Sequence, residues 1–212
     1  MNTNKKLSTV RRLVLCAAFS ALVIVLTFTN LGFITFSPVV SITILQIPVI
    51  LAATVGGLPE GIFVGFIMGL MSLIKAAMHP GTVLDPLFVN PLNSILPRML
   101  LGLVAWGIWR LLNFIPKMPG TVAAAITGFT ATFAHTLMVY GCIFIFDGAR
   151  MGDALRTLNL DGMGYLGVVG LGLPSELSEA LASTIVCAAV YAGLFIANNR
   201  RSKLSKVEEE NQ

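Results

Sequence analysis

Residues 61–77 of the chain read GIFVGFIMGLMSLIKAA. Lys75 is the only charged residue in this stretch, and a predominantly apolar run of this length is typical of a helix that crosses a lipid bilayer. Gly61, Gly65 and Gly69 recur at intervals of four and therefore share one helix face. Small residues at this spacing let helices approach closely within a membrane. The stretch predicts a membrane helix whose glycine face packs within this chain, with docking to another membrane subunit as the alternative.

The composition of the whole chain supports the same interpretation. Of 212 residues, 56% are hydrophobic and 11% are charged, whereas an ordinary soluble domain is about 25% charged. So few charges could not cover the surface of a soluble protein of this size. A membrane β-barrel is also excluded, because its strands alternate polar and apolar residues and here the apolar residues form long runs. At about 20 residues a span, about six membrane helices fit.

Glycine, proline and polar clusters separate these runs. We therefore predict an all-α integral membrane protein, a six-transmembrane-helix bundle that forms a single membrane domain over residues 1–212. The expected spans are residues 13–29, 42–58, 61–77, 92–112, 121–146 and 174–197. The connection at residues 147–173 is expected to be a polar, glycine-rich loop with a short helix near residues 151–158.

Basic residues precede the first predicted span and follow the last. Four precede the first span and four follow the last: Lys5, Lys6, Arg11 and Arg12, then Arg200, Arg201, Lys203 and Lys206. Six spans place both termini on one side, and the positive-inside rule assigns that side to the cytoplasm. The net charge of +4 does not indicate nucleic-acid binding, because no basic stripe is interleaved with aromatic residues.

Ionisable residues inside spans are candidates for a binding site, because burying them in lipid is costly. Arg98 is expected about 9 Å, and Glu179 about 7 Å, from the outer ends of their spans. At similar depths they could form a structural ion pair with each other. Alternatively they could line a pocket open to the exterior, in which Arg98 would bind a carboxylate or phosphate.

Other polar residues of the outer half join Arg98 and Glu179 in the candidate site. They are Gln46, Lys75, Asn90, Asn93, His135 and Ser175. Each also has a simpler role. A lysine at a span end can reach the interface, Asn or Ser can cap a helix, and His or Gln can hydrogen-bond between helices.

Motifs of several enzyme classes are absent from the sequence. It contains no GxxxxGK[ST] phosphate loop, no HExxH and no GxSxG. The three cysteines lack metal-ligand spacing, so we assign neither a metal site nor catalytic residues. We therefore expect no enzyme activity, although an intramembrane enzyme using His135 and Glu179 stays an alternative. A stand-alone secondary transporter is another alternative, which an inverted repeat would favour.

Three segments carry a resemblance to a known family. They are ILQIPVI at residues 44–50, GIFVGFIMGLMS at 61–72 and DPLFVNPLNSILPR at 85–98. Ala17 and Ala21 add an Ala-x-x-x-Ala pattern in the first span. Together with the basic-ended spans, these features make the whole chain resemble the substrate-binding S components of energy-coupling factor (ECF) vitamin transporters. The third segment is similar to the NPL-SVLPR stretch of the group that includes pantothenate-type and riboflavin-type members.

The resemblance implies a high-affinity substrate-binding subunit of an ATP-driven importer of a water-soluble vitamin, in a prokaryotic cell (plasma) membrane. Its partners would be an ECF transmembrane coupling subunit, which Ala17 and Ala21 would contact, and two cytosolic ATPase subunits. ATP would be used by those partners, so no cofactor is expected in this chain.

Pantothenate is the cargo we favour. Arg98, supported by Lys75, suits its carboxylate, and Asn90, Asn93 and Gln46 suit its polar backbone. Riboflavin or another vitamin is the alternative. Riboflavin would favour aromatic stacking, and only 8% of the residues are aromatic.

Overall fold

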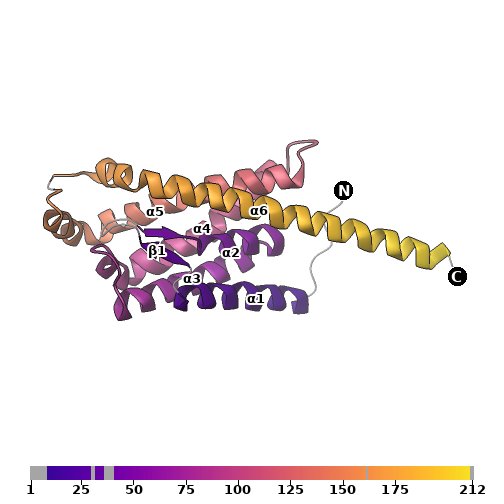
Figure 1. Cartoon of the computed structure of the whole chain (residues 1–212), viewed down its shortest axis with the longest axis horizontal. Helices are drawn as coiled ribbons and strands as arrows, with labels where there is room; N and C mark the ends of the chain where they lie inside the picture. Colours follow the sequence, from indigo (N-terminus) through magenta and orange to yellow (C-terminus); the bar gives the residue numbers. More distant parts are fainter. Residues whose placement is uncertain (1–8, 30–31, 36–40, 161, 211–212) are drawn as a thin grey trace.

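The computed structural model describes residues 9–29, 32–35, 41–160 and 162–210 of the chain. The elements in chain order are helix α1 (Thr9–Phe28), strands β1 (Phe33–Thr35) and β2 (Ser41–Thr43), helix α2 (Gln46–Leu51), the π-helix η1 (Ala52–Gly56), helix α3 (Leu58–Met78), the 3₁₀-helix η2 (Asp85–Val89), and helices α4 (Pro91–Leu112), α5 (Gly120–Thr157) and α6 (Tyr165–Glu210). The long helices lie side by side along one axis, as Figure 1 shows. Lys5 and Lys6 lie outside the described residues, as do the side chains of the four basic residues after the last predicted span.

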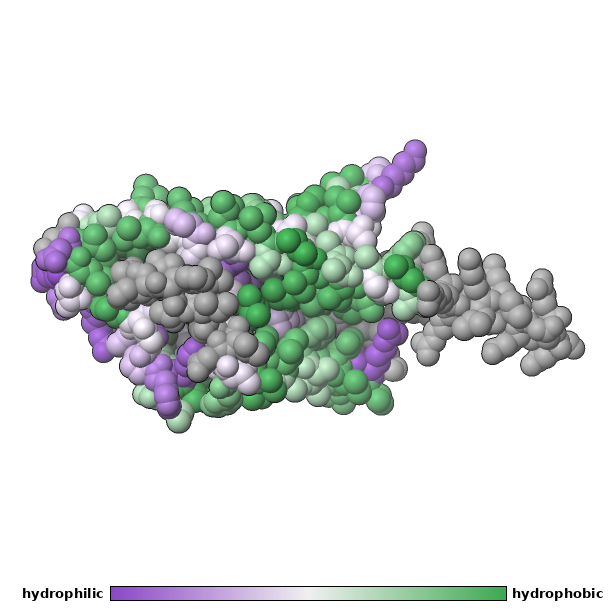
Figure 2. Space-filling view, in the orientation of Figure 1, coloured by the Kyte–Doolittle hydropathy of each residue, from purple (hydrophilic) through white to green (hydrophobic). Residues whose placement is uncertain are grey.

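Five helices in the described part of the chain are long and apolar enough to cross a membrane, judged by length and composition: α1, α3, α4, α5 and α6. Their outward faces are apolar, and Figure 2 shows hydrophobic residues over much of the visible side, with hydrophilic residues gathered towards the ends. A soluble monomer rarely exposes apolar surface on this scale. The prediction of a helical membrane bundle is therefore confirmed in its main feature.

The second predicted span, residues 42–58, is not a full crossing. Its first residues form β2, which pairs antiparallel with β1, Ile34 opposite Ile42. Helix begins only at Gln46, and α2 with η1 ends at Gly56. That segment is about 16 Å long at 1.5 Å per residue, about half of the hydrocarbon thickness of a bilayer. Hydropathy merged the hairpin and the helix into one run, because short apolar strands and buried helices cannot be distinguished by periodicity.

The short α2–η1 segment occupies the centre of the bundle. Leu45, Val49 and Ile50 are fully buried in a core that also contains Val64 of α3 and Leu101 of α4. The segment runs back towards the end at which α1 begins, so the start of α1 and the end of α6 lie at the same end of the bundle (Figure 1).

Close packing of α3 on α4 uses the glycine stripe. A Cβ at Gly65 would overlap the carbonyl oxygen of Arg98, and one at Gly102 would overlap the backbone of Gly61. Gly69 packs in the same way on Ile95. The prediction that the stripe packs within this chain is confirmed. Because the carbonyl of Arg98 lies directly against Gly65, this contact also determines where the Arg98 backbone stands.

Helices α5 and α6 extend beyond their predicted spans. The expected loop of residues 147–173 is mostly helical, since α5 bends at Asp147 (φ −135°, ψ 31°) and continues to Thr157, and α6 begins at Tyr165. Pro174, expected at a helix start, lies inside α6. The hydroxyl of Ser175, the next residue, donates to the Gly172 carbonyl at 2.8 Å.

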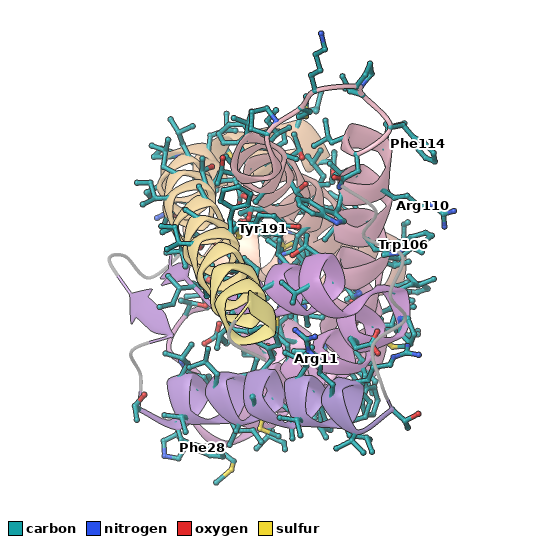
Figure 3. All side chains as sticks on the ribbon, turned by 90° about the vertical axis from the view of Figure 1, so that its right-hand side faces the viewer. Arg11, Phe28, Trp106, Arg110, Phe114 and Tyr191 are labelled. Carbon is teal, nitrogen blue, oxygen red and sulfur yellow. The ribbon has the colours of Figure 1, made fainter. Side chains whose placement is uncertain are left out.

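A second apolar cluster lies where α5 bends. It joins η2, the last turns of α5 and the first turns of α6, and its buried members are Leu84, Leu87, Val139, Ile143, Met151, Leu155 and Val168. The opposite end of the bundle has a different character. Seen from that end (Figure 3), Arg110 points away from the bundle, and its guanidinium lies 5.2 Å from the centre of the Trp106 ring.

Candidate functional site

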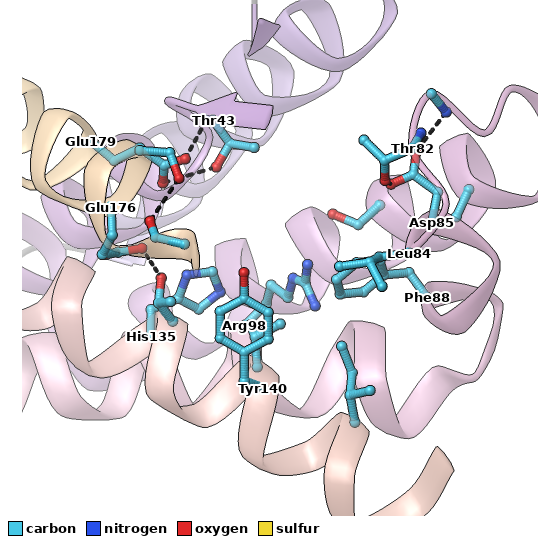
Figure 4. Close-up of a pocket in the computed structure, with 18 of the residues that line it drawn as sticks. Thr43, Thr82, Leu84, Asp85, Phe88, Arg98, His135, Tyr140, Glu176 and Glu179 are labelled. Carbon is cyan, nitrogen blue, oxygen red and sulfur yellow. Dashed lines mark hydrogen bonds between the residues drawn. The ribbon is translucent and has the colours of Figure 1, made fainter. Parts of the chain in front are cut away.

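A cavity of about 150 Å³ opens between α3, α4, α5, α6, the hairpin and η2. Figure 4 shows it from within the bundle. Its polar lining residues are Thr43, Ser72, Lys75, Thr82, Asp85, Arg98, His135, Thr136, Tyr140, Ser175, Glu176 and Glu179. Its apolar lining includes Leu84, Phe88, Val139 and Ile143. A cavity with apolar walls and a few convergent polar groups is the usual form of a small-molecule site.

The position of Arg98 follows from the local sequence of α4. Asn90 caps the helix, accepting from the Leu92 N–H at 3.1 Å. Pro97 has no N–H, so the carbonyl of Asn93, four residues earlier, lacks its helical donor. Nη1 of Arg98 donates to that carbonyl at 2.6 Å. The proline thus creates the acceptor that turns the arginine side chain back along its own helix.

The Arg98 guanidinium is buried, and no carboxylate among the residues that the structure describes pairs with it. The residue is 7% exposed, its Cζ lies 4.8 Å from the centre of the Phe88 ring, and its Nε has no hydrogen-bond partner. Figure 4 shows the guanidinium between His135 and the Phe88 side of the cavity. Stacking on an aromatic face stabilises a cation but leaves donors free for an anion.

Glu179 does not pair with Arg98, although both lie in the described part of the chain and line the same cavity. Its Oε1 accepts from the Thr43 N–H at 2.6 Å, and its Oε2 accepts from Gln46 Nε2 at 2.8 Å and from Thr43 Oγ1 at 3.3 Å. The interpretation of Arg98 and Glu179 as a structural ion pair is therefore wrong. Glu179 instead joins the hairpin and the start of α2 to α6.

Glu176, one turn before Glu179, was not singled out by the sequence analysis. It is 5% exposed and lines the cavity. Thr136 of α5 donates to its Oε2, and its Oε1 has no partner. A signal for it was available, because residues three apart share a helix face and Glu176 stands three before Glu179.

Five of the eight candidate residues line the cavity: Lys75, Arg98, His135, Ser175 and Glu179. His135 is buried there with its Nε2 unpartnered. Gln46 does not line the cavity. It lies fully buried behind Glu179, to which it donates.

Asn90 and Asn93 also stand outside the cavity lining. Their side-chain amides donate to Oδ2 of Asp147 at 2.6 and 2.5 Å, and Asn93 also donates to the Leu87 carbonyl at 3.0 Å. They therefore hold the start of α4 against η2 and the bend of α5. We expected these two residues to contact a ligand directly. In the structure they instead support the start of α4, which carries Arg98.

Far from the cavity, Ala17 and Ala21 are exposed on α1, and only three residues of this helix are buried within the bundle: Ser20, Val23 and Thr27. Near them the half-exposed Arg12 forms an ion pair with Glu60 of α3, which is 3% exposed. Among the residues that the structure describes, no three His, Cys, Asp or Glu side chains are grouped as metal ligands.

Comparison with known proteins identifies relatives of this chain. Residues 11–195 match the family described as "ECF transporter, substrate-specific component". The chain is 24% identical to the Pantothenic acid transporter PanT of Lactococcus lactis subsp. cremoris over 199 aligned positions, which cover 88% of this chain and 94% of the relative. It is 32% identical to the Pantothenate transporter PanT of Leuconostoc mesenteroides subsp. mesenteroides over 156 positions, which cover 70% and 72%. The chain therefore belongs to the substrate-specific components of ECF transporters.

Proposed function

We propose that this protein is the substrate-binding subunit of an ECF-type importer of pantothenate. Members of its family are substrate-binding subunits of transporters and not enzymes, so the alternative of an intramembrane enzyme is wrong. The observation that carries the pantothenate proposal is Arg98, a buried cation that lines the cavity and has no carboxylate partner within residues 9–29, 32–35, 41–160 and 162–210. A buried charge without a counterion is costly, and an anionic cargo would supply that counterion.

The chemistry of the lining supports a ligand of this type. Pantothenate has one carboxylate, an amide and two hydroxyl groups. Arginine binds carboxylates through charge-assisted and often paired hydrogen bonds, while the apolar side chains of Leu84, Val139 and Ile143 suit its aliphatic portion. The names of the two relatives point to the same cargo. Lys75, also in the lining, adds positive charge near the anion.

The same proposal includes an orientation in the cell membrane. Arg11 and Arg12 stand near the start of α1 and Arg110 near the end of α4, and Figure 3 shows Arg11 and Arg110 at this end of the bundle. Basic residues favour the cytoplasmic side. We infer that both termini are cytoplasmic, so that the cavity receives its ligand from outside the cell.

The proposed partners are a transmembrane coupling subunit and two cytosolic ATPase subunits. The exposed face of α1 around Ala17 and Ala21 supports docking there, because small side chains allow close helix approach in a membrane. ATP would be hydrolysed by the partners, with no cofactor bound by this chain. Replacing both alanines by phenylalanine should then abolish uptake by the assembled importer and leave ligand binding unchanged.

Binding to the purified protein tests the cargo. The chain is purified in mild detergent, the small molecule that accompanies it is identified by mass spectrometry, and titrations with pantothenate and riboflavin are compared. Saturable binding of pantothenate at a 1:1 ratio supports the proposal. Tighter binding of riboflavin, or of neither, overturns it. Uphill uptake of pantothenate into vesicles that contain this chain alone would overturn the subunit role and favour a stand-alone transporter.

A further inference from the structure

Two glutamates project from successive turns of α6 into the same cavity, and their hydrogen bonds differ. Both oxygens of Glu179 accept hydrogen bonds from the protein, with Thr43 and Gln46 as donors. Glu176 accepts one, from Thr136 to Oε2, and its Oε1 is buried without a partner. Both carboxylate oxygens of Glu179 are thus hydrogen-bonded within the protein, whereas only one oxygen of Glu176 is.

An unpartnered oxygen on a buried carboxylate is unfavourable, because the group has lost water without gaining a donor. Such atoms are rare in native proteins and need a reason. Glu176 lines the cavity, and a ligand that enters there could bring the missing donor. We take Glu176 as ionised; an ionised carboxylate only accepts hydrogen bonds, so the ligand group beside it would be a donor, such as a hydroxyl or an amide N–H.

The charges of the cavity then favour one orientation of a bound ligand. Arg98 belongs to α4 and Glu176 to α6, and Figure 4 places them on different sides of His135. A ligand carboxylate would be attracted by Arg98 and repelled by Glu176. A molecule with a carboxylate at one end and hydroxyl groups at the other therefore fits in one orientation only.

We propose that Glu176 is a specificity-determining residue, which binds the hydroxyl end of the ligand while Arg98 binds its carboxylate. This inference rests on the proposed pantothenate function. It assigns the residue that distinguishes pantothenate from acids of the same length that lack hydroxyl groups. Glu179 has no such role, because the hairpin and α2 already use its oxygens.

The test is a matrix of two ligands and three proteins. The ligands are pantothenate and the N-acyl-β-alanine of the same carbon skeleton without hydroxyls; the proteins are the unmodified chain, Glu176→Gln and Glu179→Gln. Glutamine at 176 keeps the size and can still accept from Thr136, but it presents an amide NH₂ in place of the unpartnered oxygen. Dissociation constants are measured by titration calorimetry in detergent.

The unmodified protein should bind pantothenate at least about tenfold more tightly than the acid without hydroxyls, the range expected for a hydrogen bond to a charged acceptor. Glu176→Gln should remove that preference by weakening pantothenate alone. Glu179→Gln should weaken both ligands by the same factor, as a loosened wall would. A role of Glu176 in folding alone would also weaken both ligands equally.

The outcomes separate the inference from the function on which it rests. If the unmodified protein binds both acids equally, or if Glu176→Gln keeps the full preference, the inference is overturned while pantothenate binding stands. The first of these comparisons needs no variant, so it can overturn the inference even if Glu176→Gln does not fold. If the unmodified protein binds no pantothenate, both proposals fail.

Discussion

The two ends of the bundle each bury a charged residue, and they treat it differently. At the end where the chain begins, Glu60 is 3% exposed and paired with Arg12. At the other end, Arg98 is 7% exposed, bound to a backbone carbonyl and stacked on a ring, and no carboxylate in the described part of the chain pairs with it. A charge that serves the fold has its counterion within the chain, because an unpaired buried charge is costly. Arg98 lines the cavity, and under the proposed function its counterion is the carboxylate of the ligand.

Removing the guanidinium of Arg98 should cause the largest loss of pantothenate affinity. Arg98→Ala should weaken pantothenate binding by about 100-fold or more, the range for losing one partner of a buried charge pair. The melting temperature should fall little or rise, since an uncompensated charge leaves the interior. Titration calorimetry and thermal unfolding in detergent measure both. Arg110→Ala, at an exposed arginine stacked on Trp106, is the matched control, and equal effects of the two would contradict the assignment.

Loosening the hairpin of β1 and β2 should cause the second largest loss of affinity. Glu179→Gln removes an acceptor of Thr43 Oγ1 and Gln46 Nε2, so the wall formed by β2 should open more often and affinity should fall by about tenfold. Hydrogen–deuterium exchange of the backbone amides around Thr43, followed by mass spectrometry, should become faster. Ser178→Ala is the control, because that hydroxyl bonds only to carbonyls of its own helix. Unchanged exchange around Thr43 would argue against the hairpin role.

A change at the bend of α5 should weaken pantothenate binding less. Asp147 accepts from Asn90 and Asn93, and the Asn93 carbonyl holds Arg98. Asp147→Ala should therefore let the start of α4 shift and weaken pantothenate binding by about fivefold. Asp153→Ala, at an exposed aspartate of the same helix, should change nothing. A loss as large as that of Arg98→Ala would mean that Asp147 acts on the ligand directly.

The ion pair at the opposite end should leave ligand affinity unchanged. Glu60→Gln should lower the melting temperature, because Arg12 loses its partner, and should keep the dissociation constant of pantothenate within about twofold. Adding Arg12→Gln to Glu60→Gln should lower the melting temperature little further, because the effects of substituting two paired residues are not additive. A parallel loss of affinity and stability would show that the two ends are not independent.

The sequence predicted much of the bundle and only part of the site. The limits of α1, α3 and α4 differ by a few residues from the expected spans, because apolar runs of bilayer length are read directly from composition. The hairpin and the long start of α6 were missed. Local hydropathy does not distinguish a buried strand from a helix, and Pro174, a residue type favoured in the first turn of a helix, lies inside α6.

For the site, the residue types were visible but their partners were not. Polar residues at membrane depth led to Arg98, His135 and Glu179, all of which line the cavity. Glu176 was overlooked, although its spacing from Glu179 was available.

The sequence by itself determined the helical membrane bundle and the packing face of α3, because these depend on neighbouring residues and on the thickness of lipid. Tertiary structure alone decided which charges are satisfied. Thr43 and Gln46 reach Glu179 across more than 130 positions of the chain, and only the rotation of packed helices brings them together while leaving Arg98 and Glu176 with unused hydrogen-bonding atoms. No local pattern encodes that rotation.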